Sequence, residues 1–223
     1  MVAHATREML RTIERNLAEL QSQTGIAALS PAVREALLKT PREDFVPAAD
    51  QTLAHADQAL SIGCGQTISQ PLIVALMTEL LQPQAEDRVL EVGTGSGYQA
   101  AVLAPLVARV YSMEIIPELA GQARRLLERL GIRGVEVHTG NGALGLPALA
   151  PFAKIIIAAA APSVPAPLLA QLAPGGLLVA PLGDPSAGQQ LAVIGRDERG
   201  AWWRRDVLPV SFVPFVHTES AVL

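Results

Sequence analysis

The chain has 223 residues, of which 50% are hydrophobic and 17% charged, and its formal net charge is −4 at pH 7. This composition indicates one globular α/β domain and excludes a disordered chain. The negative charge and the absence of lysine or arginine runs disfavour sequence-independent binding to nucleic acid. Cys64 is the only cysteine, so no disulfide can form within the chain, which fits a reducing compartment.

The first 50 residues or so have a helical pattern. Ser30-Pro31 predicts a helix start, with serine as the N-cap and proline at the first helical position. The segment before it lacks the continuous apolar core of a signal peptide, and no apolar run reaches 18 residues, so we expect no membrane segment and a cytoplasmic location. An amphipathic helix is predicted there by apolar residues at helical spacing: Met9, Leu10, Ile13, Leu17 and Leu20.

The rest of the chain alternates between short apolar strands and helices. Residues 63–71 are expected to form a loop, and 71–81 a helix. We then expect strands over 88–92, 109–114, 135–139, 155–159 and 177–181, with helices near 98–106, 117–130 and 165–172. Such alternation implies a parallel sheet covered on both faces. The pattern of 190–196 and 202–210 predicts an antiparallel end to that sheet.

A glycine-rich turn follows the strand at 88–92. Gly93, Gly95 and Gly97 occupy alternate positions, which lets a strand turn into a helix and leaves bare backbone for a ligand. The spacing differs from that of dinucleotide and phosphate loops, so a phosphate cradle is disfavoured. Glu91 precedes the turn, and Glu114 ends the next strand, where an acid suits a ribose diol.

At this point the sequence resembles the protein-L-isoaspartate O-methyltransferases. The glycine turn is common to many methyltransferases, whereas the segments around Ser69 and Val213 are far narrower signals. The resemblance covers most of the chain from about residue 30, and its motifs are REDFVP at 42–47, GQTISQP at 65–71, LEVGTGSGY at 90–98, GNG at 140–142, PF at 151–152, AAA at 159–161, PGG at 174–176 and FVP at 212–214.

The resemblance implies a Rossmann-like S-adenosylmethionine-dependent methyltransferase fold. Its sheet would be mostly parallel and doubly wound, with an antiparallel C-terminal end and an N-terminal helical cap. We expect residues 1–223 to form a single domain, in which 1–80 supply the cap and a substrate-side loop and 85–223 the cofactor-binding α/β core. A monomer is expected.

The activity implied is methyl transfer from S-adenosyl-L-methionine to the α-carboxylate of L-isoaspartyl residues in damaged proteins and peptides, leaving S-adenosyl-L-homocysteine. The methyl ester then cyclises to a succinimide that opens partly to aspartate. The acceptor carboxylate is ionised at pH 7, so the transfer needs neither a general base nor a metal. The work of the site would be to exclude water and to hold oxygen, methyl and sulfur in line.

The matching positions imply three groups of site residues. Ser69 would engage the substrate carboxylate, and Val213 and Pro214 would lie beside the substrate peptide, whose main chain an extended segment can bind. The cofactor would be held by Gln66, Thr67, Ile68, Glu91, Gly93, Gly95, Ser96, Gly97, Glu114, Ile115, Asn141 and Gly142.

Several of these residues have plain structural alternatives. A serine two residues before a proline is also a good N-cap, so Ser69 could start the helix at 71. The three glycines could be ordinary turn residues, and Glu114 a solvated acid at a strand end. Glu91 would support either the glycine turn or the methionine amino group of the cofactor.

The chain departs from the family pattern at four positions. In the family an aspartate usually stands at the position of Asn141 and accepts from the adenine amino group. Asparagine keeps one acceptor oxygen but loses the charge. Alternatively, Asn141 serves only as a turn residue. Ala153 replaces a usual aspartate, Ala158 a common threonine, and His55 a usual tyrosine. We interpret His55 as a loop residue rather than a catalytic one.

Two further features are expected to be structural. Cys64 is interpreted as an incidental thiol rather than a nucleophile, and Trp202-Trp203 as sheet packing or an interface rather than a stacking platform. Three other functions stay open: a relative that only binds the cofactor, a methyltransferase for a dedicated aspartate in a peptide, and a small-molecule methyltransferase. The short segment after Pro214 argues against the second, and the GQTISQP motif against the third.

Overall fold

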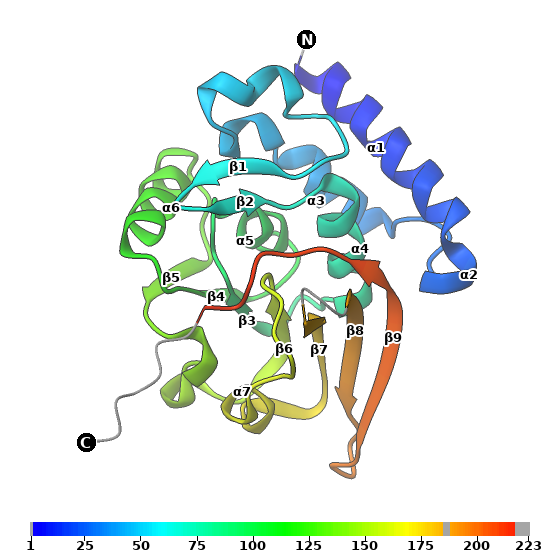
Figure 1. Ribbon diagram of the computed structural model, residues 1–223, viewed down its shortest axis with the longest axis vertical. Helices are drawn as coiled ribbons and strands as arrows, with labels where there is room; N and C mark the ends of the chain where they lie inside the picture. Colours follow the sequence, from blue (N-terminus) through cyan, green and yellow to red (C-terminus); the bar gives the residue numbers. More distant parts are fainter. Residues whose placement is uncertain (1, 185–187, 217–223) are drawn as a thin grey trace.

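The protein folds around one seven-stranded sheet in the order β5-β4-β3-β6-β7-β8-β9, seen in a computed structural model that describes residues 2–184 and 188–216 (Figure 1). The neighbouring pairs from β5 to β7 run parallel, and β8 and β9 are antiparallel to their neighbours. The strands are β3 (Arg88–Val92), β4 (Arg109–Glu114), β5 (Val135–Thr139), β6 (Phe152–Ile157), β7 (Leu172–Asp184), β8 (Gly188–Arg196) and β9 (Trp202–Val210). The predicted fold class, with its antiparallel end, is confirmed.

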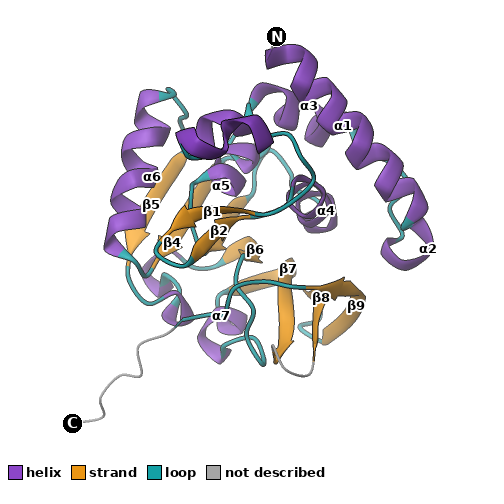
Figure 2. Ribbon diagram, turned by 45° about the horizontal axis from the view of Figure 1, so that its top comes forward, coloured by secondary structure: helices purple, strands orange, loops and turns teal. Residues whose placement is uncertain are grey.

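The helices cover both faces of this sheet: α1, α3, α4, α5 and α6 share one apolar cluster, whereas α7 packs in the other. On their common face, α1 and α6 lie at opposite ends (Figure 2). Four short 3-10 helices span Arg42–Phe45, Ala48–Leu53, Gly142–Leu144 and Pro147–Leu149. The α-helices are α1 (Val2–Glu19), α2 (Gln21–Thr24), α3 (Pro31–Lys39), α4 (Pro71–Leu81), α5 (Tyr98–Leu103), α6 (Pro117–Arg129) and α7 (Ala166–Ala170). Ser30 caps α3 as predicted, because its side chain accepts from the Val33 amide at 3.3 Å.

Alternate residues of the strands enter two apolar clusters, one on each face of the sheet. Ile156 packs with the buried face of α1 and with α4 and α5, whereas its neighbours Ile155 and Ile157 pack with Leu168 of α7. The first cluster contains residues from α1 to β9. The period-two alternation of a strand thus places neighbouring isoleucines in different cores.

The expected loop at 63–71 is wrong in its first part. Two short antiparallel strands, β1 (Leu60–Gly63) and β2 (Gln66–Ile68), form a hairpin there. Cys64 and Gly65 have φ values of +53° and +70°, the left-handed conformation that a tight hairpin turn needs. Strands of three and four residues are too short for the apolar alternation that sequence analysis relies on.

The strand expected at 177–181 is longer than predicted, because β7 begins at Leu172. Its register with β6 shifts between Phe152 and Lys154, so the Pro174-Gly175-Gly176 stretch is accommodated at a bulge. Proline and glycine are tolerated in a strand at such irregularities. The sequence marks this stretch as a turn, and only pairing with β6 makes it part of the sheet.

Candidate functional site

A pocket opens at the carboxyl ends of β3 and β4, beneath the hairpin β1–β2. β3 lies between β4 and β6, so the connections leave it toward opposite sides and a crevice forms at its end, the usual ligand position in open α/β sheets. The pocket encloses about 810 Å³, part of it open to solvent. It is lined by Gln66, Thr67, Ile68, Ser69, Val74, Val92, Gly93, Thr94, Gly95, Ser96, Tyr98, Gln99, Met113, Glu114, Ile115, Ile116, Gly142, Ala158, Ala159, Val213, Pro214, Phe215 and Val216.

The glycine turn forms the floor of this pocket. All three of its glycines have positive φ, and Gly97 stands in the left-handed conformation directly before α5. A Cβ on Gly93 would lie 3.4 Å from the Cβ of Ala158 on the neighbouring strand end. Because Gly93 has a φ of +99°, a side chain at this position would be strained, so the turn keeps bare backbone here.

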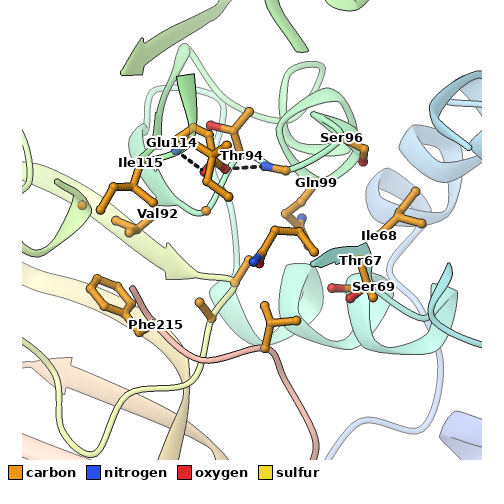
Figure 3. Close-up of a pocket in the computed structure, with 18 of the residues that line it drawn as sticks. Thr67, Ile68, Ser69, Val92, Thr94, Ser96, Gln99, Glu114, Ile115 and Phe215 are labelled. Carbon is orange, nitrogen blue, oxygen red and sulfur yellow. Dashed lines mark hydrogen bonds between the residues drawn. The ribbon is translucent and has the colours of Figure 1, made fainter. Parts of the chain in front are cut away.

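Glu114 is the buried acid of the pocket, with 6% of its surface exposed. Its Oε2 accepts from the Gly95 amide and its Oε1 from the Ile116 amide, both at 2.9 Å (Figure 3). These two bonds fix the orientation of the carboxylate at the end of β4. An ionised carboxylate has about four acceptor sites, so each oxygen keeps a further one for a ligand.

Glu91 lies behind the glycine turn and outside the pocket lining. It is fully buried, and burial raises its pKa to about 8. The Ser112 hydroxyl donates to Glu91 Oε2 and lies 2.5 Å from Thr94 Oγ1, so a hydrogen-bonded chain joins the acid to the turn. This placement corresponds to the first of the two predicted roles, support of the glycine turn.

Ser69 lines the pocket at the end of β2, facing the side opposite to Glu114 (Figure 3). It does not cap α4: the N-cap position is Gln70, without a side-chain cap bond. Instead Asp57 Oδ1 accepts from the Leu72 amide at 2.9 Å. The alternative of Ser69 as an N-cap is therefore wrong, and no hydrogen bond within the described part of the chain engages its hydroxyl.

The loop that carries Ser69 is tied down by Arg42, which is fully buried. The guanidinium donates to the carbonyl oxygens of Ala54, Gln58 (3.0 Å) and Ser69 (3.1 Å). Burial lowers the pKa of Arg42, although the nearby Tyr98 and Asp57 oppose this. The REDFVP motif alone does not predict these bonds of Arg42, because the three carbonyl groups come from other segments of the chain.

The C-terminal segment after β9 crosses the ends of the central strands and closes the pocket (Figure 1). The Ala160 amide donates to Val213 O at 2.9 Å, and the Phe215 amide donates to Ala160 O at 2.7 Å. Val213, Pro214 and Phe215 thereby face the pocket. Phe215, which sequence analysis missed, directly follows the FVP motif and lies near Val92 (Figure 3).

Asn141 and Gly142 lie on the far side of the glycine turn, after β5. Gly142 lines the pocket, and a Cβ there would meet Val92 Cγ1 at 2.4 Å. Asn141 is outside the lining, and its Oδ1 accepts from the Ala143 amide at 3.0 Å, which caps the 3-10 helix. Of the predicted site residues, Glu91, Gly97 and Asn141 stand behind the pocket wall, and the others form it.

The remaining features of the sequence lie elsewhere. His55 Nε2 is 2.9 Å from Glu43 Oε2, outside the pocket, and Ala153 lies within β6. Cys64 is exposed in the hairpin turn. Trp202 and Trp203 are exposed on β9; Trp202 stacks under Arg196, and Trp203 covers Gly195, so both pack on the sheet.

The polar groups of the pocket suit binding and orientation rather than proton transfer. In residues 2–184 and 188–216 no cluster of three histidine, cysteine or acidic side chains could hold a metal ion. No helix in these ranges has both the length and the apolar character needed to cross a membrane. What the pocket offers is a fixed carboxylate, a hydroxyl and bare backbone among apolar side chains.

Sequence and structure comparisons both lead to one group of enzymes. A family model described as protein-L-isoaspartate(D-aspartate) O-methyltransferase matches residues 12–220. A relative from Syntrophobacter fumaroxidans, named protein-L-isoaspartate O-methyltransferase 2, is 50% identical over 94% of this chain and 85% of its own. A protein of the same name from Nitrosococcus oceani is 52% identical over 93% of this chain and 94% of its own.

Two solved structures share the fold. One, a protein-L-isoaspartate O-methyltransferase, superposes with a TM-score of 0.77 at 28% identity, over 90% of this chain and 65% of that one. The other is a protein of Plasmodium falciparum described with the same activity and solved with S-adenosyl-L-homocysteine. It has a TM-score of 0.75 at 21% identity, over 93% of this chain and 98% of its own, and supports the fold alone.

Proposed function

Because the chain belongs to the protein-L-isoaspartate(D-aspartate) O-methyltransferase family, we propose that the pocket at the ends of β3 and β4 is its methyl-transfer site. The enzyme methylates the α-carboxylate of L-isoaspartyl residues in damaged proteins and so initiates repair. S-adenosyl-L-methionine supplies an electrophilic methyl group on a positively charged sulfur. The observation that carries the proposal is the placement of Ser69 and Glu114 on opposite walls of one pocket.

The residues of the sheet side fit the cofactor. Glu114 is oriented by two backbone amides and retains acceptor capacity for a ribose diol. Gly93 and Gly95 of the turn offer backbone without side chains, and Ile115 adds an apolar wall. The side-chain oxygen of Asn141 already caps the 3-10 helix. Asn141 would therefore contribute to cofactor binding through its backbone and by positioning Gly142, which lines the pocket.

The residues of the hairpin side would hold the acceptor. The Ser69 hydroxyl can donate to an ionised α-carboxylate, whose ordinary pKa is near 3.5, so that one oxygen points into the pocket. Gln66, Thr67 and Ile68 continue the same wall toward the glycine turn. Proper alignment of the reacting atoms can by itself supply roughly 7–11 kcal/mol, so no proton acceptor is required.

The segment at 212–216 would bind the peptide around the isoaspartyl residue. Val213 and Pro214 line the pocket mouth, and Ala160 holds this segment extended through two backbone hydrogen bonds. Main-chain recognition by an extended segment tolerates many flanking sequences. A repair enzyme requires that breadth, because damage occurs in unrelated proteins.

Methyl transfer from radiolabelled S-adenosyl-L-methionine tests this assignment. We expect labelling of an isoaspartyl peptide and none of its aspartyl twin. Ser69→Ala should lower kcat on the order of 10²-fold, the usual effect of removing one orienting donor, with the Kd for S-adenosyl-L-homocysteine unchanged. Ser61→Ala, on the exposed side of the same hairpin, is the matched control. Cofactor binding without transfer by the parent enzyme would instead favour a binding module.

We further propose that the enzyme acts as a cytoplasmic monomer without nucleic-acid partners. Both walls of the pocket come from one chain, the only cysteine is exposed as a free thiol, and the net charge is −4. Light scattering coupled to size exclusion tests the oligomeric state. A dimer mass across a wide concentration range would reject the monomer.

A further inference from the structure

Two buried glutamines hold the two loops that close the pocket. Gln171 lies between α7 and β7, and Gln189 lies on β8; each is 5% exposed. Neither lines the pocket. Each uses its amide as a donor and an acceptor at the same time, toward the backbone of a loop that does line it.

Gln189 holds the C-terminal segment. Its Oε1 accepts from the Phe212 amide at 2.6 Å, and its Nε2 donates to the Phe212 carbonyl at 3.2 Å. The backbone of Gln189 pairs with Val210 at the end of β9. The Gln189 side chain therefore extends the hydrogen bonding between β8 and β9 past Val210, the last residue of β9. It guides the following segment to Ala160, whose backbone binds Val213 and Phe215.

Gln171 holds the loop after β5 in the same way. Its Oε1 accepts from the Leu146 amide at 2.7 Å, and its Nε2 donates to the carbonyls of Leu144 and Pro167, both at 2.9 Å. The bonds fix the 3-10 helix that starts at Gly142, a pocket residue, against α7. Gly145 makes room for them, since a Cβ there would lie 2.4 Å from Gln171 Oε1.

We infer that Gln189 is a positioning residue for the peptide substrate and Gln171 a positioning residue for the cofactor. The inference rests on the proposed function, which puts the peptide beside 213–214 and the cofactor beside Gly142. An apolar side chain at either position would remove these bonds from partly buried backbone groups, an amide and a carbonyl at position 189 and an amide and two carbonyls at position 171. A loop that loses such bonds moves to find other partners. Because each glutamine holds a different loop, substitution of Gln189 should weaken peptide binding and substitution of Gln171 should weaken cofactor binding.

The test compares Gln189→Met with Gln171→Met, which keep the side-chain length but remove both polar atoms. We expect Gln189→Met to raise KM for an isoaspartyl peptide about tenfold, with the Kd for S-adenosyl-L-homocysteine within threefold of the parent value. For Gln171→Met we expect the Kd for S-adenosyl-L-homocysteine to rise about tenfold, with KM for the peptide within threefold of the parent value. Gln190→Met, the half-buried neighbour on β8, is the control and should change neither constant.

A general loss of stability would not produce this crossed pattern, so equal changes of both constants in both variants would overturn the inference. No change in either constant would overturn it too. The proposed function fails differently: the parent enzyme would not label the isoaspartyl peptide at all.

Gln189→Glu gives a second measurement, which also serves if Gln189→Met does not fold. A protonated carboxyl has one donor and one acceptor, like the amide, whereas an ionised carboxyl cannot donate to the Phe212 carbonyl. We expect KM for the peptide in this variant to fall as the pH is lowered from 8 to 6, relative to the parent enzyme. A ratio that does not vary with pH would contradict a role through the Phe212 backbone.

Discussion

At the scale of single residues, the pocket depends on polar groups whose partners lie far away in the sequence. Ser69 is free to face the pocket because Asp57 occupies the helix end that Ser69 could have capped. Glu114 is oriented by the Gly95 amide, 19 positions earlier. Sequence analysis identified both residues, but only these contacts distinguish a binding role from a structural one.

Glu91 makes the stability of the fold dependent on pH. Its pKa is raised from 4.5 to about 8, chiefly by burial, so the folded state binds a proton that the unfolded state releases above pH 4.5. The free energy of unfolding should therefore fall as the pH rises from about 5 to 8. Glu91→Gln removes this dependence while keeping a hydrogen-bond partner for Ser112.

Thermal unfolding of the two proteins at pH 5 and pH 8 checks this. We expect the Tm of Glu91→Gln relative to the parent to be several degrees higher at pH 8 than at pH 5, at roughly 2–4 °C per kcal/mol for a chain of this size. A constant difference across the range would show that Glu91 is ionised in the folded protein.

At the scale of elements, most helices and the central parallel strands follow from the sequence, whereas the hairpin strands and the full length of β7 do not. The bounds predicted for β3, β4, β5 and α4 match the structure to the residue. β3 ends directly before Gly93, β5 ends directly before Gly140, and α4 begins at Pro71, so turn and helix-start residues mark these bounds. The hairpin β1–β2 was missed because it is held by turn geometry and by the elements around it rather than by its own apolar residues.

The N-terminal ends of α3 and α4 offer a comparison of local and long-range capping. The Ser30 side chain makes its hydrogen bond only within its own helix α3, so Ser30→Ala should lower the free energy of unfolding by about 1 kcal/mol. Asp57 accepts from Leu72, Gln70 and Asn16, all at 2.9 Å, so Asp57→Ala should cost about 2–3 kcal/mol. Urea unfolding monitored by circular dichroism measures both, and equal losses would contradict the bridging role of Asp57.

At the scale of the whole molecule, the cap and the sheet share one apolar cluster. Ile13 of α1 and Ile156 of β6 are both fully buried members of it. We propose on this basis that residues 1–80 and 85–223 form one cooperative domain. The pocket needs this union, because Ser69 comes from the first part and Glu114 from the second.

Ile13→Ala and Ile156→Ala test that union by calorimetry. Each should lower the free energy of unfolding by about 2–5 kcal/mol and shift one and the same transition to lower temperature. If Ile13→Ala instead produced a separate early transition and left the main one in place, the cap would be an independent unit.

The sequence by itself determined the fold class, the family and the identity of most pocket residues, because these depend on local periodicity and on short motifs. The tertiary structure decided which polar groups are left for a ligand. Whether Ser69 caps a helix, whether Glu91 faces the pocket or its back, and what Arg42 and Gln189 hold all depend on partners from distant segments. Hydrogen bonds between such segments leave no periodic signal, since each requires only that two groups meet after the chain has folded.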